Sequence, residues 1–191
     1  MRTLALVLLG LFLAVDVEAA CTGSSPTWTS TPDQVSVASC VSSATRGDTI
    51  NVSAGSATWS SLSTITKGVT LQGVGTPTIT AANGSNFILQ YTPATPSNDD
   101  LFRVTGFVFN MNSAGSILHL SLSTTVEQHN IRVDNNTFQN GVFGVKPLLV
   151  EGPFYGVVDH NTFTGSAYIE NYGSSAGSNN WTNLTFDPGS A

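Results

Sequence analysis

The sequence is poor in charged residues and in cysteine, and each shortage excludes a class of protein. Only 9% of its 191 residues are charged, so a nucleic-acid-binding surface, which needs basic side chains against phosphate, is not expected. Two cysteines without neighbouring histidines cannot supply the four ligands of a structural zinc site. With 40% hydrophobic residues, however, the chain does not have a disordered composition. Its many small polar residues and glycines are typical of β proteins with tight turns.

The first 19 residues have the pattern of a secretory signal peptide. Arg2 precedes an apolar run over residues 4–15, which is too short to span a bilayer, and Val17-Glu18-Ala19 fits signal-peptidase cleavage before Ala20. A lipoprotein signal is disfavoured because Glu18 stands where an aliphatic residue is expected. A buried N-terminal helix would leave the basic start and the small-residue end unexplained. We therefore expect a secreted protein, extracellular or periplasmic, without a membrane span.

Cys21 and Cys40 both lie near the start of the mature chain. In an oxidising compartment this even pair is expected to form one disulfide, and closing a loop of about 20 residues would stabilise the fold by roughly 3 kcal/mol. Removing residues 1–19 removes one basic and two acidic residues and leaves a net charge of −5. This acidic balance again argues against nucleic acid as a partner.

One helix and a series of short strands are expected in the mature chain. Residues 31–44 are the best helix candidate, with Thr31 as cap and Pro32 at the first helical position. Its apolar face is expected to hold Val35, Ala38 and Val41. From Thr49 onward the pattern changes to short β-branched or aromatic segments bounded by turn residues. These segments read TINV, TITKGVTLQG, PTIT, NFILQY, LFRVTGFVF, SILHLSL, IRVDNNTF, LLVEG and GVVDHNTF.

Two hexapeptides, VDNNTF at 133–138 and VDHNTF at 158–163, differ at one position only. Aligning them with FRVTGFVFN at 102–110 produces one column of valines and one of phenylalanines. The columns contain Val104, Val133 and Val158, and Phe109, Phe138 and Phe163. Short strands without crossover helices leave a sandwich, a barrel or a solenoid, and the repeat favours coils stacked about 4.8 Å apart. We predict an all-β fold, a parallel β-helix.

Alternation along each strand sets the direction of the side chains in this repeat. Val133 and Phe138 are expected to point inward, and Asp134 to point outward. Between them, Asn135–Asn136 and the equivalent His160–Asn161 read as tight bends, where asparagine tolerates left-handed backbone. Asn136 and Asn161 are expected to hydrogen-bond to each other along the stack.

The Asn-Asn-Thr-Phe and His-Asn-Thr-Phe rungs resemble the right-handed parallel β-helix, or pectate-lyase-like, superfamily. ATRGDTINVSAGSATWSS at 44–61, followed by ITKGVTLQGVG at 65–75, is similar to its N-terminal region, where a short helix caps the first coil. The resemblance covers most of the mature chain. It implies a cap region over 20–48 and right-handed β-helix coils over 49–191. Because the chain ends without a convincing cap, we expect a C-terminally truncated member.

Two outward columns carry the candidate chemistry: Arg103, Arg132 and Val157 in one, and Thr105, Asp134 and Asp159 in the other. Stacked carboxylates would repel by roughly 3 kcal/mol at an effective dielectric of 20. Arg132, a bound cation or a raised carboxyl pKa would relieve that repulsion. One interpretation is an ordinary surface ion-pair cluster. The other is a site for an anionic sugar, with arginines on substrate carboxylates and Asp134 and Asp159 on Ca²⁺.

The resemblance implies polysaccharide lyase chemistry, in which Ca²⁺ bridges enzyme and uronate and an arginine or lysine removes the C5 proton. On that basis Arg103 and Arg132 are catalytic candidates, although no complete lyase signature and no paired-acid hydrolase pattern is present. His160 is a further candidate as general acid or base, and its alternative role is that of a bend residue. Candidates for substrate binding are Lys146, Tyr155 and Tyr168.

We therefore predict a secreted, monomeric protein that acts on or binds an acidic polysaccharide, as a lyase or, failing that, a glycoside hydrolase. The superfamily also contains esterases, epimerases and non-enzymatic adhesins, so the fold does not specify the activity. The alternative prediction is a non-catalytic carbohydrate-binding, adhesin-like or structural solenoid. A third is a fragment without independent activity.

Overall fold

The described part of the chain is a β structure with a single helix. The computed structural model describes residues 20–62, 64–82, 84, 87–96, 101–112, 116–165 and 169–172. The signal peptide predicted for residues 1–19 and the binding role predicted for Tyr168 lie outside these residues. Within them the chain forms sixteen strands and one helix, and the predicted all-β class is confirmed. No helix in these ranges has the length and apolarity needed to cross a membrane.

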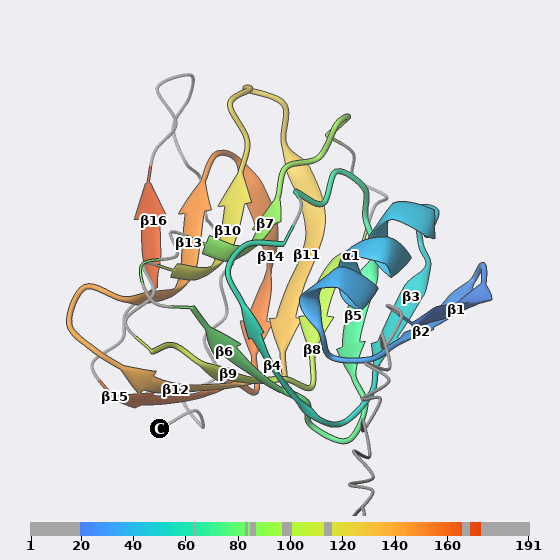
Figure 1. Cartoon of the computed structure of the whole chain (residues 1–191). Coiled ribbons are helices and arrows are strands. Elements are labelled where there is room, and N and C mark those ends of the chain that lie inside the picture. Colours follow the sequence, from blue (N-terminus) through green and yellow to red (C-terminus); the bar gives the residue numbers. More distant parts are fainter. Residues whose placement is uncertain are drawn as a thin grey trace, which may run out of the picture.

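The strands form three sheets (Figure 1). The seven-stranded sheet contains, in spatial order, β1 (Cys21–Ser24), β2 (Thr27–Ser30), β3 (Thr49–Val52), β5 (Thr70–Gly73), β8 (Phe102–Thr105), β11 (Gln128–Asp134) and β14 (Phe154–Asp159). The five-stranded sheet contains β4 (Ser56–Trp59), β6 (Thr78–Ala81), β9 (Val108–Asn110), β12 (Thr137–Gly141) and β15 (Thr162–Gly165). The four-stranded sheet contains β7 (Phe87–Tyr91), β10 (Ser116–Ser121), β13 (Lys146–Glu151) and β16 (Glu170–Tyr172).

Neighbouring strands within the three sheets are parallel, except that β1 and β2 of the seven-stranded sheet form an antiparallel hairpin. From β7 onward the chain passes through the four-, seven- and five-stranded sheets in that order, and it does so three times before reaching β16. Each passage therefore adds one strand to each sheet. Strands that are distant in sequence become neighbours, and their side chains lie in columns.

The predicted columns are confirmed. Val133 on β11 pairs with Val104 on one side and Val158 on the other. Phe138 on β12 pairs in the same way with Phe109 and Phe163. The rings stack with centroids 5.3 Å and 5.2 Å apart, which is an offset-stacking distance. Like residues thus pack on like residues from one strand to the next.

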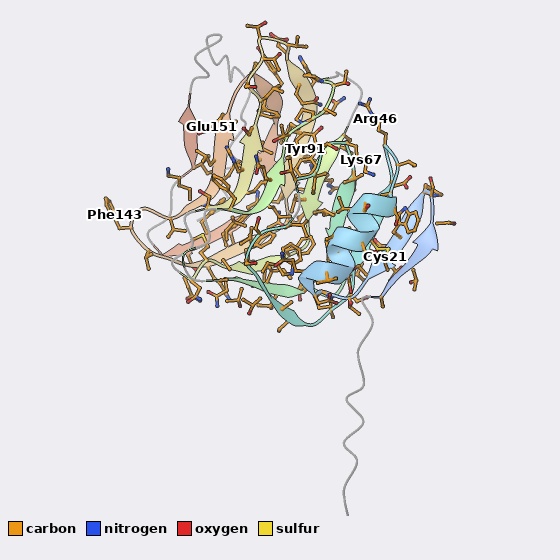
Figure 2. The ribbon with its side chains drawn as sticks, turned by 45° about the horizontal axis from the view of Figure 1, so that its top comes forward. Cys21, Arg46, Lys67, Tyr91, Phe143 and Glu151 are labelled. Atoms are coloured by element: carbon orange, nitrogen blue, oxygen red, sulfur yellow. A yellow bond between two sulfur atoms is a disulfide. The ribbon has the colours of Figure 1, made fainter. Side chains whose placement is uncertain are left out.

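The three sheets face one hydrophobic core. Ile50, Ile79 and Leu118 come from the seven-, five- and four-stranded sheets, and each is at most 1% exposed. Tyr91 lies inside, where its ring stacks on Phe102 at 4.1 Å (Figure 2). By contrast, Phe143 in the loop between β12 and β13 projects from the molecule and is 93% exposed. Side chains from all three sheets therefore share a single interior.

Helix α1 (Gln34–Ser43) lies at the N-terminal end of the sheets and is shorter than predicted (Figure 1). Its N-cap is Asp33, not Thr31: the Asp33 carboxylate accepts a bond from the Ser36 N–H at 2.8 Å. The Thr31 hydroxyl donates to the same carboxylate at 2.5 Å. The predicted apolar face is also wrong for Val35, which is 67% exposed, because the helix packs inward through the face that carries Val37 and Cys40. The buried positions are Ser36, Val37, Cys40 and Val41.

The N-terminal region is tied together by a disulfide and by a buried carboxylate. The predicted disulfide joins Cys21 on β1 to Cys40 on α1. Asp48 is buried, and its carboxylate accepts bonds from the Thr45 N–H, Trp28 Nε1 and Ser25 Oγ, each at 2.8 Å. The Thr45 N–H, together with the Trp28 and Ser25 donors, lowers the pKa of Asp48 from 3.8 to about 2.

Candidate functional site

The arginines and aspartates predicted to form the site lie on the outer face of the seven-stranded sheet. Arg103 pairs with Arg132, which pairs with Val157, and Asp134 pairs with Thr105 and Asp159. The intervening valines point into the core and are at most 5% exposed. Since side chains alternate along a strand, the arginines and aspartates share the opposite face. The structure therefore brings together the arginine and aspartate candidates from three neighbouring strands.

Arg103 and Asp134 form a bidentate ion pair. The distances are 2.7 Å from Nε to Oδ1 and 2.5 Å from Nη2 to Oδ2. The Asp134 side chain is completely covered, although its position is an outward one, and it also accepts a bond from Asn135 Nδ2 at 2.6 Å. Burial alone would raise the pKa of Asp134, but the hydrogen bond and charge of Arg103 outweigh it, so the pKa lies below its ordinary value. The same bond raises the pKa of Arg103.

Arg132 is the more accessible of the two guanidinium groups. Its side chain is 44% exposed, against 31% for Arg103. Its Nη2 donates to Asp159 Oδ2 at 3.0 Å, while its Nε lies 3.6 Å from Asp134 Oδ1. The predicted repulsion between the stacked carboxylates is thus relieved by two arginines, one for each aspartate. Arg132 retains donors that face solvent and suit a carboxylate ligand.

His160 shares the Asp159 carboxylate with Arg132. Its Nδ1 lies 2.8 Å from Asp159 Oδ2, and its side chain is 61% exposed. A carboxylate accepts only, so Nδ1 is the donor here and Nε2 is the acceptor of the neutral ring. The other oxygen, Asp159 Oδ1, is buried and has no hydrogen-bond partner among the described residues. The His160 ring and the Arg132 guanidinium therefore meet at one carboxylate oxygen.

The bend after each strand has the predicted backbone. Asn135 and His160 occupy equivalent positions with φ of 54° and 53°, in the left-handed region. The asparagines that follow form the predicted amide ladder, with Asn136 Nδ2 donating to Asn161 Oδ1 at 3.1 Å. Asn136 Oδ1 also accepts from the Phe107 N–H at 3.0 Å. His160 is consequently a bend residue, and its side chain is directed to Asp159.

A hollow of about 370 Å³ adjoins this cluster. Arg132 and Val157 line one side, and Tyr155 and His129 line another. The rings of Tyr155 and His129 stack at 4.5 Å and are nearly parallel, with 7° between their planes. Glu127 accepts a bond from Tyr155 Oη at 3.0 Å and lies 3.0 Å from His129 Nε2. The predicted binding residue Tyr155 thus belongs to the same face as Arg132.

One predicted site residue lies on another sheet, and the contacts of two histidines were not predicted. Lys146 is on β13 in the four-stranded sheet, so the structure does not bring it to the face that carries Arg132. His119 on β10 pairs with Glu151 on β13 at 2.9 Å and stacks on Phe87 at 4.1 Å. Neither His119 nor His129 is among the residues predicted for the site. The alternation of the strands carried no signal for either contact.

The aspartates do not offer a calcium shell as they are arranged. Calcium takes six to eight oxygen ligands, whereas both oxygens of Asp134 are engaged by Arg103. Within the described ranges, no group of three or more His, Cys, Asp or Glu side chains is placed to hold a metal ion. The calcium site stays a prediction, and it would require Arg103 to leave Asp134.

Comparisons with protein-family models, with curated proteins and with solved structures find no match to this chain.

Proposed function

We propose that the chain is a right-handed parallel β-helix of the pectate-lyase-like type, secreted and monomeric, that binds and cleaves an acidic polysaccharide. Two observations support the β-helix. The chain passes repeatedly through three sheets of mainly parallel strands, and its valines and phenylalanines stack in columns. The polymer would lie across β8, β11 and β14, on the face that carries Arg103 and Arg132.

The observation that carries this function is the sharing of one Asp159 oxygen by Arg132 and His160, at 3.0 Å and 2.8 Å. Arg132 is exposed, planar and fixed in orientation, as a guanidinium must be to hold a sugar carboxylate with two hydrogen bonds. His160 is held beside it with Nε2 as its acceptor nitrogen. A carboxylate on Arg132 would place the neighbouring C–H bonds of the sugar close to His160.

These roles amount to β-elimination. His160 Nε2 takes the proton from C5 of the uronate, the bond between C4 and the glycosidic oxygen breaks, and a C4=C5 double bond forms. The departing oxygen takes a proton from solvent. Arg132 stabilises the negative charge that develops on the carboxylate during proton removal. Arg103 is not assigned as the base, because its two bonds to Asp134 raise its pKa. Arg103 acts as a second cation that attracts the carboxylates of the polymer.

The test compares the protein with His160→Asn on pectate, alginate and hyaluronate, following the ultraviolet absorbance of unsaturated products. Asparagine is the residue at the equivalent bend, Asn135, so the left-handed backbone is retained and folding should be unaffected. We expect the rate to fall by at least about 100-fold, as for loss of a general base. Undiminished activity of His160→Asn would contradict the assignment of the base.

The charge balance of the cluster favours a second function, that of a non-catalytic solenoid that binds the polymer or is purely structural. Each arginine of the cluster is already paired with an aspartate, which is also what a structural ion-pair network requires. A binding module would retain polymer in affinity electrophoresis and release no unsaturated product with any of the three polymers. Binding that depends on Arg132 without turnover would select this function over the lyase.

A further inference from the structure

The strands of the five-stranded sheet carry no charged side chain. This sheet forms the lower layer of the molecule in Figure 1. Its strands β4, β6, β9, β12 and β15 read SATW, TITA, VFN, TFQNG and TFTG, without an acidic or basic residue. The outer face of the seven-stranded sheet differs, because it carries Arg103, Arg132 and Asp159. A ligand on the five-stranded sheet would therefore be bound without ion pairs to these strands.

The outward side chains of this sheet form two columns. Ile79, Phe109 and Phe138 point into the core, so the positions on either side of each face outward. The first column contains, in register, Ser56, Thr78, Val108, Thr137 and Thr162. The second column contains Thr58, Thr80, Asn110 and Gln139. All of these positions are half-buried or exposed, so the columns form an accessible array of hydroxyl, amide and methyl groups.

The array is regular in two directions. Neighbours in one column are about 4.8 Å apart, and the two columns are about 6.6 Å apart, the rise of two residues. Beneath it, the rings of Phe109, Phe138 and Phe163 stack with angles of 19° and 5° between successive planes. This side-chain ladder limits the twist of the sheet and keeps its outer face flat. Threonine is stiff at χ1, so its hydroxyl and methyl groups have few alternative positions.

The hydroxyl groups of this face are free to bind an external ligand. Within the described part of the chain they make no hydrogen bond to another protein group, whereas Asn110 Oδ1 accepts a bond from Asn140 Nδ2 at 3.0 Å. Val108 is the only outward aliphatic residue of the two columns, and neither column contains an aromatic residue. A second protein copy would find little apolar surface here, and a sugar ring would find no aromatic platform. The chemistry of the face suits ordered water.

We propose that the outer face of the five-stranded sheet binds the surface of an ice crystal. The oxygen atoms on the prism faces of ice repeat in two directions, at distances close to the two repeats of the array. Hydroxyl and amide groups take the places of lattice water molecules, and the methyl groups fill the hollows between them. Because these groups are fixed before binding, little conformational entropy is lost. A charged side chain would hold its own hydration shell, which does not fit the lattice. Ice binding and polymer binding do not depend on each other, because they use different sheets.

The experiment measures the inhibition of ice recrystallisation and the thermal hysteresis of the whole protein, beside serum albumin at equal mass. Thr78→Tyr and Thr137→Tyr each place a bulky ring in the first column, and tyrosine is well tolerated in strands. Thr49→Tyr is the matched control. Thr49 is also a half-buried, outward threonine, but its column on the seven-stranded sheet continues through Thr70 into Arg103. Circular dichroism and thermal melting verify that all variants fold.

We expect the parent protein to keep ice crystals small at concentrations at which serum albumin does not. Thr78→Tyr and Thr137→Tyr should each raise the concentration needed for the same inhibition by about 10-fold or more, the usual cost of losing a central contact. Thr49→Tyr should inhibit recrystallisation as the parent protein does. Thr78→Tyr should also leave the binding and cleavage of acidic polymer unchanged, because Thr78 lies on the other sheet.

Three outcomes would overturn ice binding by this face. The first is a parent protein that affects ice no more than serum albumin does. The second is an equal loss of inhibition in Thr49→Tyr and Thr137→Tyr, which would mean that the face is wrongly assigned. The third is a dimer in analytical ultracentrifugation that Thr137→Tyr dissociates, because the face would then be occupied by a second copy of the chain.

Discussion

At the scale of single residues, Asp134 holds the site together instead of facing the ligand. Its buried carboxylate fixes Arg103 through two bonds and lies close to Arg132. Asp134→Asn would keep the shape but leave Arg103 without its counter-ion. We expect the free energy of unfolding to fall by about 2 kcal/mol, less than for a fully buried pair because Arg103 is 31% exposed. Urea unfolding followed by fluorescence measures this difference.

Asp159→Asn is the control for this prediction. Its partner Arg132 is 44% exposed and well screened by solvent, so the loss of stability should stay below about 1 kcal/mol. Equal losses for the two variants would mean that burial of Asp134 has no energetic consequence, and they would contradict the positioning role.

Some of these residue contacts were predictable from the repeat, and others were not. Asn135 and His160 stand at equivalent places in near-identical hexapeptides, so their shared left-handed backbone followed from the sequence. The contacts among Glu127, His129 and Tyr155 were not predictable from the sequence. The pairing of β11 with β14 shifts register between Gln128 and Ile131. A bulge of this kind breaks the alternation from which outward positions are counted.

At the scale of elements, Asp48 links the β1–β2 hairpin to the turn between α1 and β3. It accepts bonds from Trp28 and Ser25 on one side and Thr45 on the other. Because folding lowers its pKa from 3.8 to about 2, the ionised carboxylate contributes stability above pH 4 that is lost as the pH falls toward 2. Melting temperatures measured between pH 7 and pH 2 should show a decline in this window.

Asp48→Asn supplies the comparison for this pH dependence. The variant should melt at a lower temperature than the parent protein at pH 7, and it should lose less stability between pH 4 and pH 2. Parallel melting curves for the two proteins across the whole range would show that Asp48 does not cause the acid response.

The capping helix shows why element boundaries were harder to predict than element types. Thr31 and Asp33 are both good N-cap residues, and only the bond from the Ser36 N–H distinguishes them. The buried face is set by tertiary packing instead, since Cys40 is bonded to Cys21 on β1 and Val37 is fully buried. The register of the parallel strands was easier to predict, since a column of identical residues in successive repeats fixes it.

At the scale of the whole molecule, the phenylalanine column tests whether the sheets behave as stacked coils. Phe138 is buried between Phe109 and Phe163, on β12, which lies between β9 and β15 in the five-stranded sheet. Phe138→Ala should cost about 3–5 kcal/mol, the usual loss for a buried aromatic side chain. In a solenoid each coil contacts only its neighbours, so the loss should remain local.

Hydrogen exchange followed by mass spectrometry can locate that loss. In Phe138→Ala we expect faster amide exchange in β9, β12 and β15, with β2 and β3 as protected as in the parent protein. The distant strands serve as the internal control, because β3 contributes Ile50 and Val52 to the core and neither β2 nor β3 pairs with a strand of the phenylalanine column. Equal acceleration in all strands would show that the three sheets unfold as one cooperative unit, and it would contradict the β-helix proposed here.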